Sequence, residues 1–215
     1  MARRAFITSA AALTAATALL LTGCGGDDSA PDDIKGADAG SKSPSASAPA
    51  PTAPGADRPE ITLPSSFRLT FRDWKSDDPT KQAVLDDGRE ELRSGYAAIT
   101  ANDPESEALA FYHTESGLSQ AQQRIRSYTD KDLTVIGDLP VFDPEVTLGT
   151  GGNNAVPTYC TDESEASSKD LKTGEVAGNP PGMAPEAFSS LSMTKNKQSV
   201  WQTVSARSER GGCQR

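Results

Sequence analysis

The most reactive side chains in this sequence are three cysteines and a single histidine, His113. One histidine cannot form a two-histidine metal site. A nucleophilic triad would need His113 beside a serine and a carboxylate, but no Gly-x-Ser-x-Gly pattern, the mark of a nucleophile elbow, occurs in the chain. We therefore predict no catalytic residue and no metal site, and we interpret His113 as a surface or hydrogen-bonded neighbour of Tyr112.

Two short polar segments also fail to match a known binding motif. "GTGGNN", residues 149–154, is rich in glycine but lacks the lysine of a phosphate-binding loop, so we predict a hairpin turn. "CTDESE", residues 160–165, gathers acidic residues without the spacing of an EF-hand, so we predict a solvated acidic turn. Neither segment indicates a cofactor, and we predict none.

Cys24 follows an apolar run near the N-terminus. Two arginines precede residues 5–21, which carry no charge, and this is the pattern of an export signal. "LTGC", residues 21–24, then matches the bacterial lipobox, whose cysteine is linked to a diacylglyceryl group. We predict a signal peptide over residues 1–23 and a lipid on Cys24, which would hold the chain on the extracytoplasmic face of the cell membrane. The alternative is an ordinary signal peptide with an incidental cysteine, and the general secretory and twin-arginine routes both stay open.

The other two cysteines are Cys160 and Cys213. Outside the membrane a disulfide is chemically permitted, and two residues allow a single pairing. Closing a loop of this length would contribute about 4 kcal/mol to stability in the chain-entropy treatment. We predict a disulfide between Cys160 and Cys213, with two free thiols as the alternative.

The chain is acidic, and its negative net charge limits the partners that it can bind. The formal net charge is −9, and removal of residues 1–23 takes away two arginines and no acid, which leaves −11. Nucleic acid is excluded as a partner, because the sequence has no basic patch to neutralise phosphates. An anionic membrane surface repels such a chain, so the lipid on Cys24 must supply the attachment.

Composition divides the mature chain into a tether and one domain. Ala, Ser, Pro and Gly dominate residues 27–59, where Ile34 is the only branched aliphatic residue. Such a segment cannot bury enough apolar surface to offset its ordering entropy. We predict a disordered tether over residues 24–60 and one folded domain over residues 61–215.

Apolar periodicity places helices in the first half of this domain. Asp78 and Pro79 supply the N-cap and the first residue of a helix that runs to about residue 100. Its apolar face is formed, at steps of three and four, by Leu85, Gly88, Leu92, Tyr96 and Ile99. We predict a second helix capped by Asp103. After an interruption at Gly117, a third helix carries Ala121, Ile125 and Tyr128 on its apolar side.

From residue 133 the pattern changes to β-branched residues and turn signals. Residues 133–149 are interrupted by Gly137, Pro140 and Pro144, so we predict separate strand pieces there. Further predicted features are strands at 67–71 and 155–160, a turn at Thr173–Gly174, and a hairpin that turns at 195–197. Helices followed by a run of antiparallel strands indicate the α+β class.

Several segments carry a resemblance to a known group of proteins. "LPSSFRLTFRDWKSDDPTKQAVLDDG" from Leu63, "ALAFYHT" from Ala108, "YCTDES" from Tyr159 and the late Trp201 and Cys213 resemble Streptomyces-type actinobacterial lipoproteins of unknown function with an NTF2-like domain. The resemblance covers most of residues 60–213 and implies a cone in which N-terminal helices pack on a curved antiparallel sheet. It supports the predicted disulfide and brings no catalytic residue. The chain departs from the group near residues 162–187, where we predict a mobile loop.

Five aromatic residues would either line a ligand cavity in such a cone or fill it as core: Tyr96, Phe111, Tyr112, Tyr128 and Trp201. Our leading functional prediction is a non-catalytic binding domain for a small molecule or an envelope protein. One alternative is a small isomerase or dehydratase that uses Tyr112, His113 or a buried acid, and the other is a passive structural component of the envelope. An open, polar-lined pocket that contains His113 or an acid would favour the enzyme.

Overall fold

A computed structural model describes residues 57–213 of the chain. Its helices are α1 Pro79–Ala101, α2 Glu107–Phe111 and α3 Glu115–Thr129. Its strands are β1 Phe67–Phe71, β2 Leu133–Leu148, β3 Asn154–Asp162, β4 Ala166–Asp170, β5 Val176–Ala177, β6 Glu186–Lys195 and β7 Trp201–Arg210. Cys24, the signal peptide and most of the predicted tether lie outside the described residues, so those statements stay predictions.

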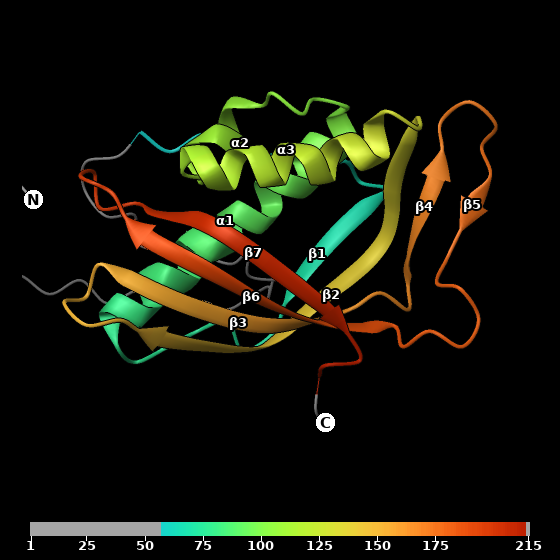
Figure 1. Ribbon diagram of the computed structural model, residues 1–215. Coiled ribbons are helices and arrows are strands. Elements are labelled where there is room, and N and C mark those ends of the chain that lie inside the picture. The colour runs from blue at the N-terminus through green and yellow to red at the C-terminus, as the bar shows by residue number, and fades with distance from the viewer. Residues whose placement is uncertain (1–56, 214–215) are drawn as a thin grey trace, which may run out of the picture. The chain divides into compact units, whose positions relative to one another are not determined.

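The strands form one curved sheet, and the helices lie across its inner face (Figure 1). The strand order is β5-β4-β2-β3-β6-β7, all antiparallel, and β1 pairs with β2 in parallel. β2 pairs with β4 along its first part and with β3 along its second, and it bends between the two. The predicted α+β class and the predicted packing of N-terminal helices on a curved antiparallel sheet are confirmed.

The bend in β2 corrects the prediction of separate strand pieces. Gly137, Pro140 and Pro144 all lie within one continuous strand. Gly137 has a φ of +95°, and a Cβ atom there would lie 2.1 Å from a backbone carbonyl oxygen just before β4. Beyond Phe142 the pairing with β3 shifts through a β-bulge. Bulges and glycines bend a strand without ending it, so these residues curve the sheet around the helices.

α1 begins and ends close to the predicted positions. The Asp78 side chain caps the helix by accepting hydrogen bonds from the backbone N–H groups of Thr80 and Lys81. Pro79 is the first helical residue, and Asn102 ends the helix in the left-handed conformation. The predicted apolar face is buried, and it comprises Leu85, Gly88, Leu92, Tyr96 and Ile99. The prediction of this helix is confirmed.

The next two helices differ from the prediction at their starts. α2 begins at Glu107 with Ser106 at the N-cap, while the Asp103 side chain accepts a hydrogen bond from the Glu105 N–H in the preceding turn. Gly117 does not interrupt a helix, because it lies in the first turn of α3. A Cβ atom at Gly117 would lie 2.0 Å from a backbone carbonyl oxygen of β7. This glycine therefore lets α3 approach the sheet closely.

Part of the segment predicted as a mobile loop, near residues 162–187, forms a β-hairpin instead. β4 pairs with the first part of β2, and β5 pairs with β4. Asp170 fixes the turn, because its carboxylate accepts hydrogen bonds from the N–H groups of Lys172 at 2.8 Å and Thr173 at 2.7 Å. Polar side chains dominate β4, so no apolar alternation marks it as a strand in the sequence.

Cys160 on β3 and Cys213 just after β7 form a disulfide, with their Sγ atoms 2.10 Å apart. β6 lies between β3 and β7 in the sheet, so the bond crosses one strand and ties the C-terminal end of the chain to the middle of the sheet. No helix within residues 57–213 is long and apolar enough to cross a membrane.

Candidate functional site

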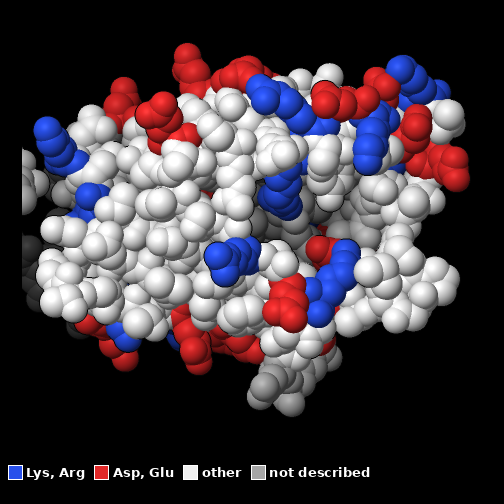
Figure 2. Space-filling view, in the orientation of Figure 1, with Lys and Arg blue, Asp and Glu red and all other residues white. Residues whose placement is uncertain are grey.

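A cavity of about 430 Å³ lies between α1, α3 and the inner face of β3, β6 and β7. Figure 2 shows this face of the molecule hollowed beside the helices, with basic and acidic side chains near the margin. Its wall combines apolar and charged side chains, among them Glu91, Leu92, Tyr96, His113, Ala121, Arg124, Tyr128, Tyr159, Leu191 and Thr203. The cone is therefore open at this position, because its own side chains do not fill it.

Glu91 and His113 form a buried pair on the cavity wall. His113 Nε2 lies 3.0 Å from Glu91 Oε1, and His113 Nδ1 lies 2.7 Å from the Leu109 carbonyl oxygen. Both ring nitrogens thus face acceptor oxygens, and the imidazolium form donates to both. Burial lowers the pKa of His113. The hydrogen bond to Glu91 and the charge of that carboxylate raise the pKa by more than burial lowers it, so the net pKa lies above its ordinary value.

The backbone of His113 is held against β7. The Thr203 N–H donates to the Tyr112 carbonyl oxygen at 2.9 Å, and the Thr114 N–H donates to the Thr203 carbonyl oxygen at 3.0 Å. The Gln202 side chain adds a hydrogen bond to the His113 carbonyl oxygen at 3.2 Å. These contacts fix the ring position, which explains how a residue outside the regular helices reaches Glu91.

Arg124 reaches the same cavity from α3. Its guanidinium carbon lies 5.2 Å from the centre of the Tyr96 ring, which is a cation–π arrangement. Its charge also acts on Tyr128, Tyr159 and Glu91. No carboxylate of residues 57–213 lies within ion-pair distance of Arg124, and its side chain stays exposed to the cavity space.

Two buried tyrosines present neutral phenol groups. Burial raises the pKa of Tyr96 and of Tyr159 above the ordinary value, and the charge of Arg124 only partly offsets this effect. A neutral phenol is both a hydrogen-bond donor and an acceptor. The site therefore offers hydrogen-bonding groups of both kinds beside apolar surface from Leu92 and Leu191.

An ion pair lies where this cavity meets a second, smaller one. Glu163 pairs with Arg210, and Arg210 also donates to the Ala184 carbonyl oxygen at 3.1 Å. The second cavity, of about 180 Å³, shares both charged residues with the first, as well as Tyr96 and Tyr128. The Cys160–Cys213 disulfide holds together the two chain segments that carry this pair.

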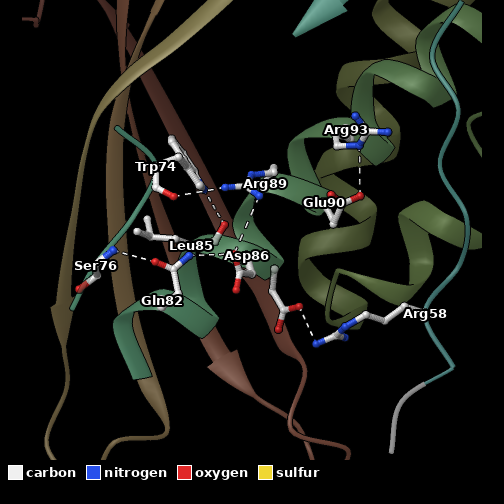
Figure 3. Close-up of polar contacts among 10 residues, drawn as sticks. Arg58, Trp74, Ser76, Gln82, Leu85, Asp86, Arg89, Glu90 and Arg93 are labelled. Carbon is white, nitrogen blue, oxygen red and sulfur yellow. Dashed lines mark hydrogen bonds and ion pairs between the residues drawn. The ribbon is translucent and has the colours of Figure 1, made fainter. Parts of the chain in front are cut away.

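The segment before β1 holds α1 in place, and α1 is the helix that carries Glu91. Figure 3 shows Arg58 reaching from this segment toward α1, where it pairs with Asp87 at 2.8 Å. The Asp87 carboxylate also accepts from the Trp201 N–H at 2.8 Å. Burial raises the pKa of Asp87 to about 6, although the contacts of Trp201 and Arg58 lower it. The folded domain thus includes Arg58, which the sequence assigns to a tether ending at residue 60.

The five aromatic residues predicted as cavity lining separate into two groups. Tyr96 and Tyr128 lie on the cavity wall. Phe111, Tyr112 and Trp201 do not line it, and for these three the other alternative holds, that they pack in the apolar core. Tyr112 packs with Ile61 and Val200 in a separate apolar cluster, with the Phe111 ring against it at 4.9 Å, while Trp201 is 1% exposed within the main core.

Two charged residues of the site, Glu91 and Arg124, are not among the residues predicted from the sequence. Arg124 lies three residues after Ala121 and four before Tyr128, so it falls on the apolar side of its own helix. Glu91 likewise interrupts the apolar face of α1 next to Leu92. A charged residue on the apolar side of a helix is the local signal from which both residues could have been predicted. Within residues 57–213, no group of His, Cys, Asp or Glu side chains is placed to hold a metal ion.

Comparison with known proteins finds similarity in structure only. No family model matches the chain, and no curated protein matches its sequence. The intermembrane-space region of chloroplast protein ARC6 is similar at a TM-score of 0.47 and 14% identity, over 60% of this chain and 96% of that one.

Two bacterial structures are also similar. For a ketosteroid isomerase-like protein from Erwinia carotovora atroseptica the TM-score is 0.40 and the identity 14%, over 58% of this chain and 94% of that one. For Aln2 from a Streptomyces species the values are 0.44 and 10%, over 63% and 94%. At these identities the likeness concerns the fold alone.

Proposed function

We propose that the cone binds a small organic molecule, and that a lipid on Cys24 holds this binding domain at the extracytoplasmic face of the cell membrane. The observation that supports binding is the open cavity of about 430 Å³. Its wall combines aromatic and aliphatic side chains with a few polar groups, which is the usual composition of a ligand site. The sole histidine has both ring nitrogens engaged by protein oxygens, so its free capacity for proton exchange is small.

The test of binding is a ligand screen against the full-length chain in detergent micelles by saturation-transfer NMR, with empty micelles as the blank. A variant that fills the cavity, Ala121→Trp, should lose the signals of every bound compound. The matched control is Gln123→Trp on the same helix, at an exposed position outside the cavity wall, which should keep them. Equal binding by both variants would place the ligand elsewhere. A chain that binds no compound would favour an envelope protein as the partner.

The membrane attachment is supported by the lipobox at residues 21–24 and by the apolar run before it. The test is metabolic labelling with radioactive palmitate in a bacterial host. We expect label in the wild type and none in Cys24→Ala, which should be lost from the membrane fraction. Label on the alanine variant would contradict the lipid anchor.

A second candidate, an isomerase-type enzyme, is favoured by one observation. The Glu91 carboxylate lines the cavity, is 12% exposed, and is held in place by His113 at 3.0 Å. Such a carboxylate could move a proton between carbon atoms of a bound carbonyl compound, with His113 as its positioning residue. The test is deuterium incorporation from heavy water into carbonyl compounds that bind. Incorporation that disappears in Glu91→Gln while binding persists would support the enzyme.

A further inference from the structure

The charge of the cavity has a sign opposite to that of the chain. Two carboxylates face the cavity, and each has a cationic partner: Glu91 pairs with His113, and Glu163 pairs with Arg210. Arg124 and Arg207 also line it, and neither has a carboxylate of residues 57–213 within ion-pair distance. The cavity therefore has an excess of positive charge within a chain whose net charge is −9.

Arg124 is the cation best placed to meet a ligand. Arg207 lies on β7, whereas Arg124 lies over the Tyr96 ring, and its charge acts on Tyr128, Tyr159 and Glu91. A guanidinium keeps its charge at all ordinary pH values and presents five N–H donors in a planar fork. With no protein carboxylate on it, most of this fork stays free for a ligand.

We propose that the ligand is an organic monoanion with an apolar body, held by its carboxylate on Arg124. The inference rests on the proposed function, since it assigns the chemistry of the same site. A carboxylate accepts two parallel N–H bonds from a guanidinium, and these are among the stronger hydrogen bonds in proteins. The apolar body of the ligand lies against Leu92, Tyr96 and Leu191, which line the same cavity.

The position of Glu91 explains why a monoanion fits better than a phosphate ester. Its carboxylate acts on Arg124 from the same wall. A second negative charge on the ligand would be repelled by the Glu91 carboxylate. We therefore expect a carboxylic acid to bind better than a dianion of the same size.

The test compares three probes of similar shape by isothermal titration calorimetry on the full-length chain in detergent micelles: trans-cinnamate, its neutral amide, and phenyl phosphate. We expect the wild type to bind cinnamate at least about tenfold more tightly than the amide, because the amide lacks the charge. Arg124→Gln should weaken cinnamate by a similar factor and leave the amide unchanged. The matched control is Arg126→Gln on the same helix, which pairs with Glu105 outside the cavity and should change nothing.

The outcomes separate the inference from the proposed function. Amide binding equal to or tighter than cinnamate binding, or cinnamate binding unchanged in Arg124→Gln, overturns the anion inference and leaves small-molecule binding intact. Tighter binding of phenyl phosphate than of cinnamate overturns the monoanion assignment. Binding of none of the three probes, together with a silent ligand screen, overturns both. The comparison of acid and amide on the wild type decides the inference even if Arg124→Gln fails to fold.

Discussion

Replacement of Arg58 by methionine should destabilise the domain in a way that depends strongly on pH. Arg58 is the cation of the buried pair with Asp87, whose side chain is 3% exposed. The pKa of Asp87 is raised to about 6 because burial outweighs the contacts with Trp201 and Arg58. A folded-state pKa above the ordinary 3.8 means that the folded chain binds this proton more tightly than the unfolded chain. The stability that this carboxyl contributes is thus fully present below pH 3.8 and is lost as the pH rises through 6.

The magnitude follows from the same values. In the wild type, the free energy of unfolding that Asp87 contributes falls by roughly 3 kcal/mol between pH 3.8 and neutral pH. This follows from about 1.4 kcal/mol for each unit by which the folded-state pKa exceeds the ordinary 3.8. In Arg58→Met the pKa of Asp87 rises further, and the carboxyl then stays protonated, which limits the loss of stability. Relative to the wild type, the free energy of unfolding of Arg58→Met therefore falls by nearly zero at pH 5, by at most about 1.4 kcal/mol at pH 7, and by more at pH 8.

Equilibrium unfolding in urea measures this effect through the fluorescence of Trp74 and Trp201, both buried. The double variant Arg58→Met, Asp87→Asn should lose the pH dependence, because no carboxyl remains to titrate. As a matched control, Arg68→Met breaks the exposed pair with Asp138. The pKa of Asp138 is lowered by Arg68, so that small effect should shrink as the pH falls. Equal destabilisation by Arg58→Met at pH 5 and pH 8 would refute the reasoning.

Three further predictions concern the site and its supports. His113 is the only histidine, so its ring protons can be followed by NMR. Its titration midpoint should lie above the ordinary 6.5 and should fall in Glu91→Gln. The stability that His113 contributes should be present below pH 6.5 and lost as the pH rises through the midpoint. Gly117→Ala should cost about 1–3 kcal/mol or more, because its Cβ would overlap β7, whereas Gly88→Ala, with no atom within 4 Å, should stabilise by about 0.5–1 kcal/mol in thermal melts. Cys213→Ser should lower stability by about 4 kcal/mol, and a melting curve that matches the wild type would contradict a structural disulfide.

Local signals in the sequence were sufficient for much of the fold. The Asp78–Pro79 cap and the apolar steps of three and four predicted α1, because both depend on residues within one or two turns. The turn of the last hairpin lies between β6 and β7 as predicted. By contrast, β4 has a polar sequence and forms through its pairing with β2, a partner distant in the chain. Propensity and periodicity carry little information about such pairing.

The candidate site was less accessible to sequence reasoning, for a physical reason. Tyr96 and Trp201 are both buried aromatic residues, yet only Tyr96 lines the cavity. That difference depends on which part of the inner face of β3, β6 and β7 the helices α1 and α3 leave uncovered. Arg124 carried a usable local signal, a charge on the apolar side of α3, but only the packing of α3 over the sheet shows that it faces the cavity.

The proposed binding mode can be tested directly by a crystal structure of the chain with trans-cinnamate at saturating concentration. This binding mode places the ligand in the cavity between α1, α3 and the sheet, with its carboxylate within hydrogen-bond distance of the Arg124 guanidinium and its ring against Leu92 and Tyr96. A cavity closed by the chain's own side chains, or a ligand bound elsewhere or with its carboxylate turned away from Arg124, would contradict it.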